Sequence, residues 1–443
     1  TLDHTDAQQL KSGQNIYGQG MWAASLRYHE GRFYVCFVAN DTRKTYLYTS
    51  EKIDGPWKKQ LIEGFYHDGS LLFDEDGRNY IVYGNDEIWI TELNEDLTAP
   101  KKDGLHRLLV SDHKNPELGY EGSHIQKING YYYIFLVHSL RDRWMRTEAC
   151  FYSDSLEGEF TGGDVLCDDR GYCGQGVAQG GIVDTPDGKW YAMLFQDSGA
   201  VGRLPILLPV TWKDHFPIFG QNGHVPEEIE VHSTRPGYIY QPLVGSDDFC
   251  NGLLPRWQFN HDPDPRYYHL DALQGTYTIT TREVCTELTQ AVNTLTQRMS
   301  YPSCAAEVTV DASALKEGDV AGLCAFQGCY AAVGITKHHG KYEVLMLDKK
   351  EDGILDMTEG TVVESHQMDF RLEADFCNMK DEARCYYRVN KGDWLPIGTV
   401  HKLYFKLDHF TGCRFGLFCY AAEETGGSAC FRDFKYYDVD EIS

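Results

Sequence analysis

The sequence predicts an all-β chain, with a β-propeller followed by a β-sandwich. Two observations predict the propeller: a residue of interest stands nine positions before a turn glycine in four segments, and the glycines recur at intervals of 46, 53 and 58 residues. The four pairs are Trp22 and Gly31, Asp68 and Gly77, Glu121 and Gly130, and Gln179 and Gly188. Short alternating apolar runs flank each glycine, as in β-hairpins. The interval is about the length of a four-stranded blade, so the repeats predict consecutive blades.

If the repeats are blades, the four residues before the glycines fall at equivalent places at the start of the innermost strand of each blade. We therefore expect Trp22, Asp68, Glu121 and Gln179 to converge on one axial funnel. Carboxylates that are buried together need partners or change their pKa. Cleavage of a glycosidic bond uses one carboxylic acid to protonate the leaving oxygen and a second carboxylate, while an aromatic face supports the sugar ring. The pattern favours sugar chemistry; for either acid alone, the alternative is a turn cap or a solvated side chain.

The segments GMWAASLRYHEGRFYV, YHDGSLLFDEDGRNYIVYG, YEGSHIQKINGYYYIF and GVAQGGIVDTPDGKWYAML resemble successive blades of glycoside hydrolase family 43, the five-bladed β-xylosidases and α-L-arabinofuranosidases. The resemblance implies that Glu121 is the general acid and that Asp68 orients this acid and modulates its pKa. It also implies substrate binding by Trp22, by Gln179 and by Arg203, which lies in AVGRLPILLPVTW. Glu117, four residues before Glu121, is a competing candidate acid that we expect at the surface.

This sequence departs from the family pattern in two ways. Members invert the anomeric configuration with a separate aspartate as general base, on a strand that precedes the Trp22 blade. Only Asp3 and Asp6 precede Trp22 here, so we expect an incomplete amino-terminal blade and impaired hydrolysis. Many relatives carry a histidine that helps to hold an axial ion where this chain has Gln179. We therefore expect no required cofactor and no metal ligands, with an axial Ca²⁺ left open.

The predicted domains are a propeller over residues 1–220, a linker over 221–245 and a sandwich over 246–443. The linker segment QNGHVPEEIEVHSTRPGYIYQPLVG holds three prolines and no alternation long enough for a core strand. The following segment, SDDFCNGLLPRWQFNHDPDPRYYHL, resembles the opening of the concanavalin-like sandwich that follows the propeller in one branch of the family. Runs such as AAEVTVDAS and HKLYFKLDHF, separated by polar turns, are typical of packed antiparallel sheets.

Composition restricts the partners and the compartment. The formal net charge of −25 disfavours nucleic acid and anionic membranes, which attract basic surfaces, whereas a small neutral oligosaccharide is indifferent to it. No run of eighteen apolar residues predicts a membrane span. The 14 cysteines are scattered through strand-like runs without a C-x-x-C pair, which favours buried thiols in a reducing, cytoplasmic setting over disulfides or a metal site. His67 and His124 adjoin the two acids as expected hydrogen-bonding neighbours.

The sequence thus predicts an inverting glycosidase that releases terminal xylose or arabinofuranose from xylan- or arabinan-derived oligosaccharides. The choice of pentose, the linkage and the oligomeric state stay open. The alternative is a non-catalytic carbohydrate-binding propeller that keeps Trp22, Gln179 and Arg203 in its funnel. A propeller scaffold for protein partners is the third hypothesis, and it gives an axial pair of acids no purpose.

Overall fold

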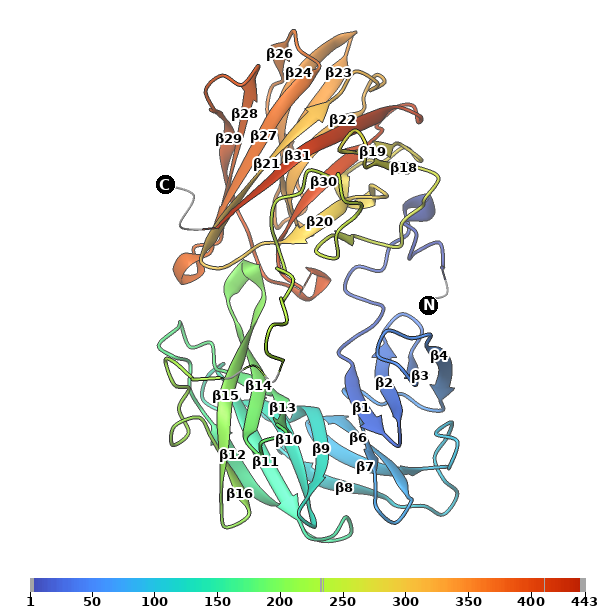
Figure 1. Cartoon of the computed structure of the whole chain (residues 1–443), viewed down its shortest axis with the longest axis vertical. Helices are drawn as coiled ribbons and strands as arrows, with labels where there is room; N and C mark the ends of the chain where they lie inside the picture. The colour runs from blue at the N-terminus through green and yellow to red at the C-terminus, as the bar shows by residue number, and fades with distance from the viewer. Residues whose placement is uncertain (1–3, 232, 234, 410, 439–443) are drawn as a thin grey trace. The chain divides into compact units, whose positions relative to one another are not determined.

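The computed structural model describes residues 4–231, 233, 235–409 and 411–438, and these form two compact β units (Figure 1). The first unit contains residues 19–197 and 203–231, and the second contains 4–18, 198–202 and 235–438. Segments 4–18 and 198–202, which were predicted as part of the propeller, belong to the second unit, and the predicted linker over 221–245 is divided between the two units. Among the described residues, no helix has the length and apolar character needed to cross a bilayer.

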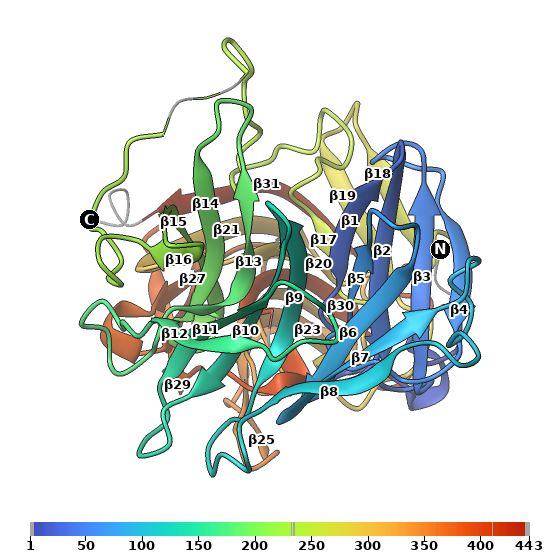
Figure 2. The same ribbon diagram turned by 90° about the horizontal axis from the view of Figure 1, so that it is seen from below.

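The first unit is a propeller of four antiparallel blades in the described part of the chain, which confirms the predicted all-β class and its propeller (Figure 2). Each blade has four strands paired in chain order. The first blade holds β1 (Ser25–His29), β2 (Arg32–Ala39), β3 (Lys44–Ser50) and β4 (Lys58–Ile62). The second holds β5 (Ser70–Phe73), β6 (Asn79–Asn85), β7 (Glu87–Leu93) and β8 (His106–Ser111).

The other two blades repeat this order. The third holds β9 (Glu121–Ile128), β10 (Tyr131–Ser139), β11 (Arg146–Ser153) and β12 (Thr161–Leu166). The fourth holds β13 (Ala178–Asp184), β14 (Trp190–Asp197), β15 (Arg203–Lys213) and β16 (Phe216–Phe219). The first strands of consecutive blades, β1, β5, β9 and β13, lie next to one another and are the innermost strands.

The four predicted turn glycines all lie between the first and second strands of their blades. Gly31, Gly77, Gly130 and Gly188 have φ angles of 79°, 82°, 84° and 79°. This left-handed conformation is readily adopted only by glycine, which explains why the same residue recurs at each tight hairpin. The repeat in the sequence is therefore a repeat of one backbone turn.

Apolar side chains pack between neighbouring blades. Ile125, Ile134 and Leu136 of the third blade are fully buried against Val82 and Ile90 of the second. A similar cluster lies between the third and fourth blades, and another between the first and second. Burial of this kind stabilises the unit by about 25 cal/mol for each Å² of apolar surface, so each blade depends on its neighbours for its core.

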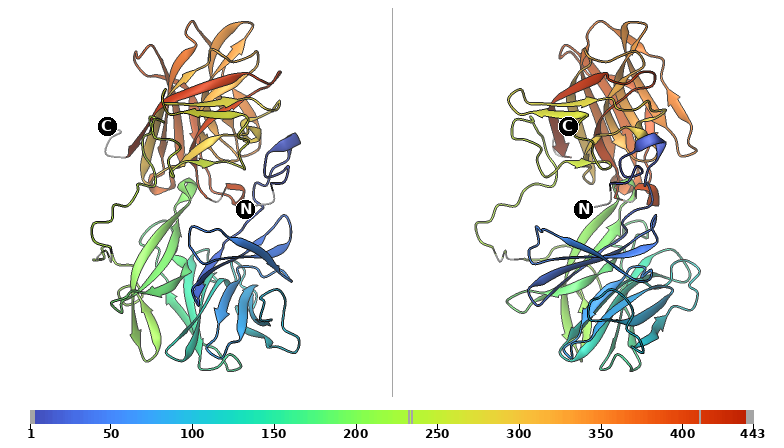
Figure 3. Two further views of the ribbon diagram at one scale, coloured as in Figure 1. Left: turned by 45° about the vertical axis from the view of Figure 1, so that its right-hand side comes forward. Right: turned by 90° about the vertical axis from the view of Figure 1, so that its right-hand side faces the viewer.

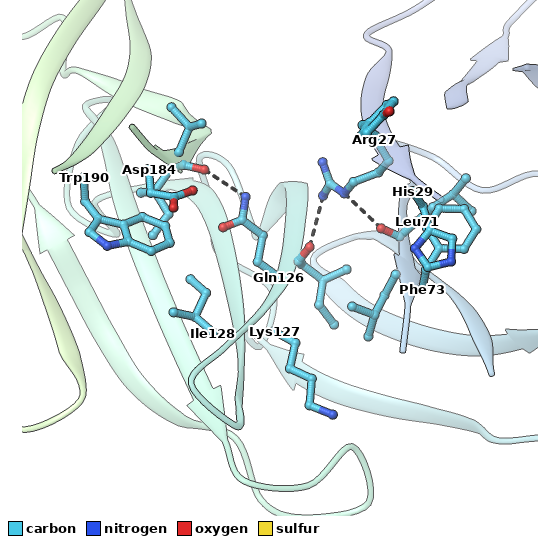
Figure 4. A pocket seen from close by; sticks show the side chains of 14 residues that line it. Arg27, His29, Leu71, Phe73, Gln126, Lys127, Ile128, Asp184 and Trp190 are labelled. Carbon is cyan, nitrogen blue, oxygen red and sulfur yellow. Dashed lines mark hydrogen bonds between the residues drawn. The ribbon is translucent and has the colours of Figure 1, made fainter. Parts of the chain in front are cut away.

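Polar side chains also join the innermost strands, in the half nearest the hairpin glycines (Figure 4). Arg27 donates from Nε to the carbonyl of Leu71 and from Nη2 to that of Ile125, both at 3.0 Å. Gln126 donates to the carbonyl of Ile182 at 2.8 Å. Side chains of four blades line a cavity of about 290 Å³ here, and none of the predicted site residues is among them. These hydrogen bonds of Arg27 and Gln126 join the inner strands of all four blades, and we call this group of contacts the clamp.

The second unit is a sandwich of two antiparallel sheets, as the sequence predicts (Figures 1 and 3). One sheet contains β17 (Gln258–Phe259), β20 (Leu295–Arg298), β30 (Arg414–Tyr420), β22 (Val320–Phe326), β23 (Ala331–His338), β24 (Lys341–Lys349), β25 (Leu355–Met357) and β26 (Thr361–Val363). The other contains β18 (Tyr268–Asp271), β19 (Thr276–Thr280), β31 (Ser428–Asp438), β21 (Ser303–Asp311), β27 (Gln367–Asp375), β28 (Glu382–Val389) and β29 (Leu395–Lys402).

Five short 3-10 helices complete the described secondary structure. These are η1 (Lys11–Gly13), η2 (Gly199–Val201), η3 (Leu288–Gln290), η4 (Cys377–Met379) and η5 (Leu407–His409). The amino-terminal segment is held within the second unit, where Arg282 donates to the carbonyls of Gln9 and Leu10. Asp6 lies in a turn of this segment, and Asp3 lies outside the described residues. All fourteen cysteines are free thiols, and most are buried.

Candidate active site

Asp68 and Glu121 come from neighbouring blades and meet beside His67. Asp68 precedes β5 and Glu121 is the first residue of β9. One ligand atom from each of the three side chains lies within 4.8 Å of the other two. His67 Nε2 is 3.7 Å from Asp68 Oδ2 and 3.8 Å from Glu121 Oε2. The side chains of Asp68 and Glu121 are only 9% and 18% exposed, so two acids share one largely enclosed space.

Each carboxylate accepts one short hydrogen bond from the neighbouring blade: Glu121 from the second blade and Asp68 from the third. Asn85, at the end of β6, donates from Nδ2 to Glu121 Oε2 at 2.9 Å. The backbone N–H of Gly122 donates to Asp68 Oδ2 at 3.1 Å. Both bonds use the oxygens that face His67, so the orientation of the two acids is fixed from the same side.

The charged groups in this cluster shift one another's pKa. Burial raises the pKa of Asp68, and the nearby Glu121 carboxylate raises it further, while His67 opposes the shift. The pKa of His67 is raised by its polar interaction with Glu121 and by the charges of Asp68 and Glu121, against the effect of its own burial. The two carboxylates therefore favour the charged form of His67, and that charge opposes their mutual repulsion.

Trp22 reaches the same cluster through His67. The two rings are 5.8 Å apart between centroids and meet edge to face at 64°. The backbone N–H of Trp22 donates to the carbonyl of Val38 at 2.9 Å, which fixes the approach of the chain to β1. The indole thus packs against the imidazole that lies between the two carboxylates.

Arg203 begins β15 and is held by a small network on the fourth blade. Its Nε lies 3.3 Å from Asp197 Oδ1, and its guanidinium lies over the ring of Phe195, 4.3 Å from the centroid. Arg146 of β11 pairs with the same aspartate. Burial lowers the pKa of Arg203, while the charges of Asp197 and Glu121 oppose this shift. Arg203 therefore lies within the electrostatic reach of the acids.

Gln179 occupies the equivalent place on the fourth blade and lies against Gly122. A Cβ atom on Gly122 would be 2.9 Å from Gln179 Nε2, so any side chain at 122 would have to displace Gln179. Gln179 and Asp68 both have left-handed backbones, with φ angles of 63° and 48°. The structure thus brings Trp22, Asp68, Glu121, Gln179 and Arg203 into one region.

Among the described residues, this cluster is also the one group of side chains placed closely enough to bind a metal cation together. It offers one imidazole nitrogen and two carboxylates, from His67, Asp68 and Glu121. A cation bound there would take the oxygens that an acid catalyst needs for its proton. His124 lies elsewhere, under Gly181, and burial lowers its pKa to about 3.

Sequence reasoning did not assign a role to Asn85, Arg146 or Asp197. Asn85 follows a glycine in YGND, which has the composition of a turn and gave no indication of a contact with Glu121. Arg146 and Asp197 lie on β11 and β14, far from the repeat frame, and only the packing of two blades joins them. Glu117, the competing acid, is exposed in its loop.

Comparisons of the sequence and of the structure with known proteins point to the same family. Residues 2–217 match the glycosyl hydrolases family 43, and residues 246–437 match the β-xylosidase C-terminal concanavalin A-like domain. A solved structure of a bifunctional GH43-CE protein from Bacteroides eggerthii is 40% identical with a TM-score of 0.89. That match covers 100% of this chain but 57% of the other, so the chain spans just over half the length of this relative.

Two curated relatives align with almost the whole chain. A β-xylosidase from Formosa agariphila is 25% identical, over 96% of this chain and 78% of the relative. A xylosidase/arabinosidase from Butyrivibrio fibrisolvens is 23% identical, over 96% of this chain and 87% of the relative. The chain belongs to glycoside hydrolase family 43 and carries the C-terminal concanavalin A-like domain found in β-xylosidases.

Proposed function

We propose that the protein releases terminal xylose or arabinofuranose from xylan- or arabinan-derived oligosaccharides with inversion of the anomeric configuration. The observation that carries this proposal is the meeting of Asp68 and Glu121 within 4.8 Å, beside Trp22 and Arg203. The names of the two curated relatives, a β-xylosidase and a xylosidase/arabinosidase, support the pentose class. Neutral sugars also suit a chain with a net charge of −25.

Glu121 acts as the general acid. Asn85 holds Oε2, so Oε1 is the oxygen that delivers a proton to the glycosidic oxygen as the bond breaks. Asp68, held by Gly122, orients the acid and sets the charge around it. Trp22 supplies an apolar face for the sugar ring, while Gln179 and Arg203 bind its hydroxyl groups.

Asp68 is too close to Glu121 to activate the attacking water in an inverting reaction. Acid and base are about 6.5–9.5 Å apart in inverting enzymes, because a water molecule must fit between the base and the sugar. The two carboxylates here have oxygens within 4.8 Å. Water activation in this proposal therefore falls to another group, and Asp68 keeps the orienting role.

Replacing Glu121 with Gln in the natural full-length protein tests the acid. We expect the rate on xylobiose or an arabino-oligosaccharide, which have poor leaving groups, to fall by about 10²–10⁴. Dinitrophenyl pentosides should lose far less, because their leaving group needs little protonation. Glu117→Gln, which changes an exposed acid four residues away, should leave both rates unchanged. Equal losses on both substrates would contradict the assignment of the acid.

The stereochemistry of the released sugar tests the mechanism. Proton NMR during turnover should show the inverted anomer first. A retained anomer would instead make Asp68 a nucleophile, since carboxylates about 5 Å apart are typical of retaining enzymes. A wild-type protein that binds xylose or arabinose, seen as quenching of tryptophan fluorescence, without any turnover would favour the carbohydrate-binding alternative.

A further inference from the structure

A fully buried carboxyl lies behind Gln179 and has no role in the reaction described above. Glu148, in β11, is 0% exposed. Its Oε2 accepts a hydrogen bond from the backbone N–H of Gln179 at 2.7 Å, and its Oε1 has no hydrogen-bond partner among the described residues. Burial raises the pKa of Glu148 well above its ordinary value. Buried polar groups with so few partners are rare enough to need an explanation.

The hydrogen bond from Gln179 falls at a strained point of the backbone. Gln179 has a φ angle of 63°, in the left-handed region that is unfavourable for a non-glycine residue. The next residue, Gly180, has no space for a side chain, because a Cβ there would lie 2.0 Å from the carbonyl oxygen of Met193. Glu148 and the tight passage at Gly180 thus hold this short segment from two sides.

The side chain of Gln179 carries the constraint onward to the acids. A Cβ on Gly122 would lie only 2.9 Å from Gln179 Nε2 and 3.0 Å from Gln179 Cγ, so the side chain of Gln179 packs closely over Gly122. Gly122 directly follows Glu121, and its N–H donates to Asp68 Oδ2 at 3.1 Å. Contacts therefore run without a break from Glu148 through Gln179 and Gly122 to both carboxylates.

We propose that the buried carboxyl of Glu148 is a positioning residue for the glycosidase reaction, acting through Gln179. It fixes the main chain of Gln179, whose side chain then holds Gly122 and, with it, the relative placement of Asp68 and Glu121. The inference rests on the proposed function. Glu148 itself does not touch the sugar.

Two substitutions separate this role from a contribution to folding. Glu148→Gln keeps the size and an acceptor oxygen, so turnover of xylobiose should stay within about threefold of wild type. Glu148→Ala removes the acceptor, and we expect kcat to fall by about 10²-fold, because displacements near 1 Å at a catalytic pair have effects of this size. The loss should be larger for xylobiose than for a dinitrophenyl xyloside, since proton delivery is disturbed. If Glu148 contributed to folding alone, the rates on both substrates would fall by the same factor.

A double-mutant cycle tests the route through Gln179. Gln179→Gly removes the side chain but tolerates the left-handed backbone. If Glu148 acts through Gln179, the double variant Glu148→Ala/Gln179→Gly should be no slower than Gln179→Gly alone. Multiplied losses would overturn the route, and so would a Glu148→Ala variant within twofold of wild type. If Glu148→Ala does not fold, a loss above tenfold in Glu148→Gln or an unchanged Gln179→Gly overturns it.

The same measurements separate this inference from the proposed function. A wild-type protein that hydrolyses neither xylosides nor arabinofuranosides overturns both. An active wild type with an unchanged, folded Glu148→Ala variant overturns only the positioning role of Glu148. Circular dichroism and thermal melting on every variant identify the folded ones.

Discussion

The two halves of the propeller's inner strands hold charged groups in opposite ways. Near the hairpin glycines, Arg27 donates to the carbonyls of Leu26, Leu71 and Ile125 and to the hydroxyl of Ser70. At the strand starts, Asp68 and Glu121 repel each other and each has a single short hydrogen bond. A charge that is fully paired with the backbone serves the fold. A charge that is left partly unpaired, at a cost in stability, is available for chemistry.

The largest expected effect is at the clamp. Arg27→Met leaves the carbonyls of Leu71 and Ile125 without their donor, and buried orphan groups cost about 1–3 kcal/mol each. We expect the free energy of unfolding in urea to fall by about 3 kcal/mol, while the folded fraction keeps its kcat. Arg32→Met, which removes an exposed arginine on β2, should change stability by less than about 0.5 kcal/mol. If Arg27→Met lost activity without losing stability, Arg27 would serve the reaction and not the fold.

Asp68→Asn should have the reverse pattern. Asparagine keeps the shape and accepts a left-handed backbone, but it removes the charge that orients the acid. We expect kcat on xylobiose to fall by about 10²-fold, which equals about 2.7 kcal/mol of activation free energy. Because burial disfavours the ionised form of Asp68, the variant should be at least as stable as wild type at pH 7. A destabilised Asp68→Asn protein would make Asp68 structural.

A smaller effect is expected at Trp22. Loss of the indole removes an apolar face next to the acids, so Trp22→Ala should raise KM about tenfold, or about 1.4 kcal/mol, with little change in kcat. Trp190→Ala is the matched control, because Trp190 lines the cavity at the other half of the inner strands. Isothermal titration with xylose measures the same difference without turnover. Equal effects of the two substitutions would remove the distinction between the halves.

The smallest expected effect is a pH dependence at His67. Its pKa in the folded protein is raised above 6.5, so the stability that it contributes is fully present below pH 6.5 and is lost as the pH rises through the folded-state pKa. Wild-type stability should therefore fall above pH 6.5, and the fall should be shallower in His67→Gln. Glu121→Gln removes the main cause of the shift and should flatten the same part of the curve. Urea unfolding at several pH values gives the slopes, and a His67→Gln curve parallel to wild type would contradict the prediction.

The repeat frame located most of the fold and the centre of the site, for a physical reason. A fixed distance to a turn glycine keeps strand register, so equivalent residues start equivalent inner strands. Gly77 and Gly130 have nearly the same φ, and Asp68 and Glu121 consequently lie side by side. This part of the prediction depended only on local hairpin geometry.

What the sequence did not reveal depends on contacts between distant strands. Glu148 is one of many residues in alternating runs, and nothing in RTEACFYS marks it as buried or as an acceptor for Gln179. The placement of Asn85 against Glu121 also needs two blades to be packed together. Likewise, residues 4–18 precede the propeller in the chain but belong to the sandwich unit, where Arg282 holds them.

The backbone at the site makes its positions unequal for engineering. Asp68 and Gln179 sit at positive φ, whereas Trp22 and Glu121 do not. The backbone at position 22 carries no such restriction, whereas at 68 and 179 the left-handed conformation costs most side chains conformational energy. Gly, Asn and Asp have the smallest cost there. Altered sugar preference in this scaffold should therefore arise first on the blade that carries Trp22.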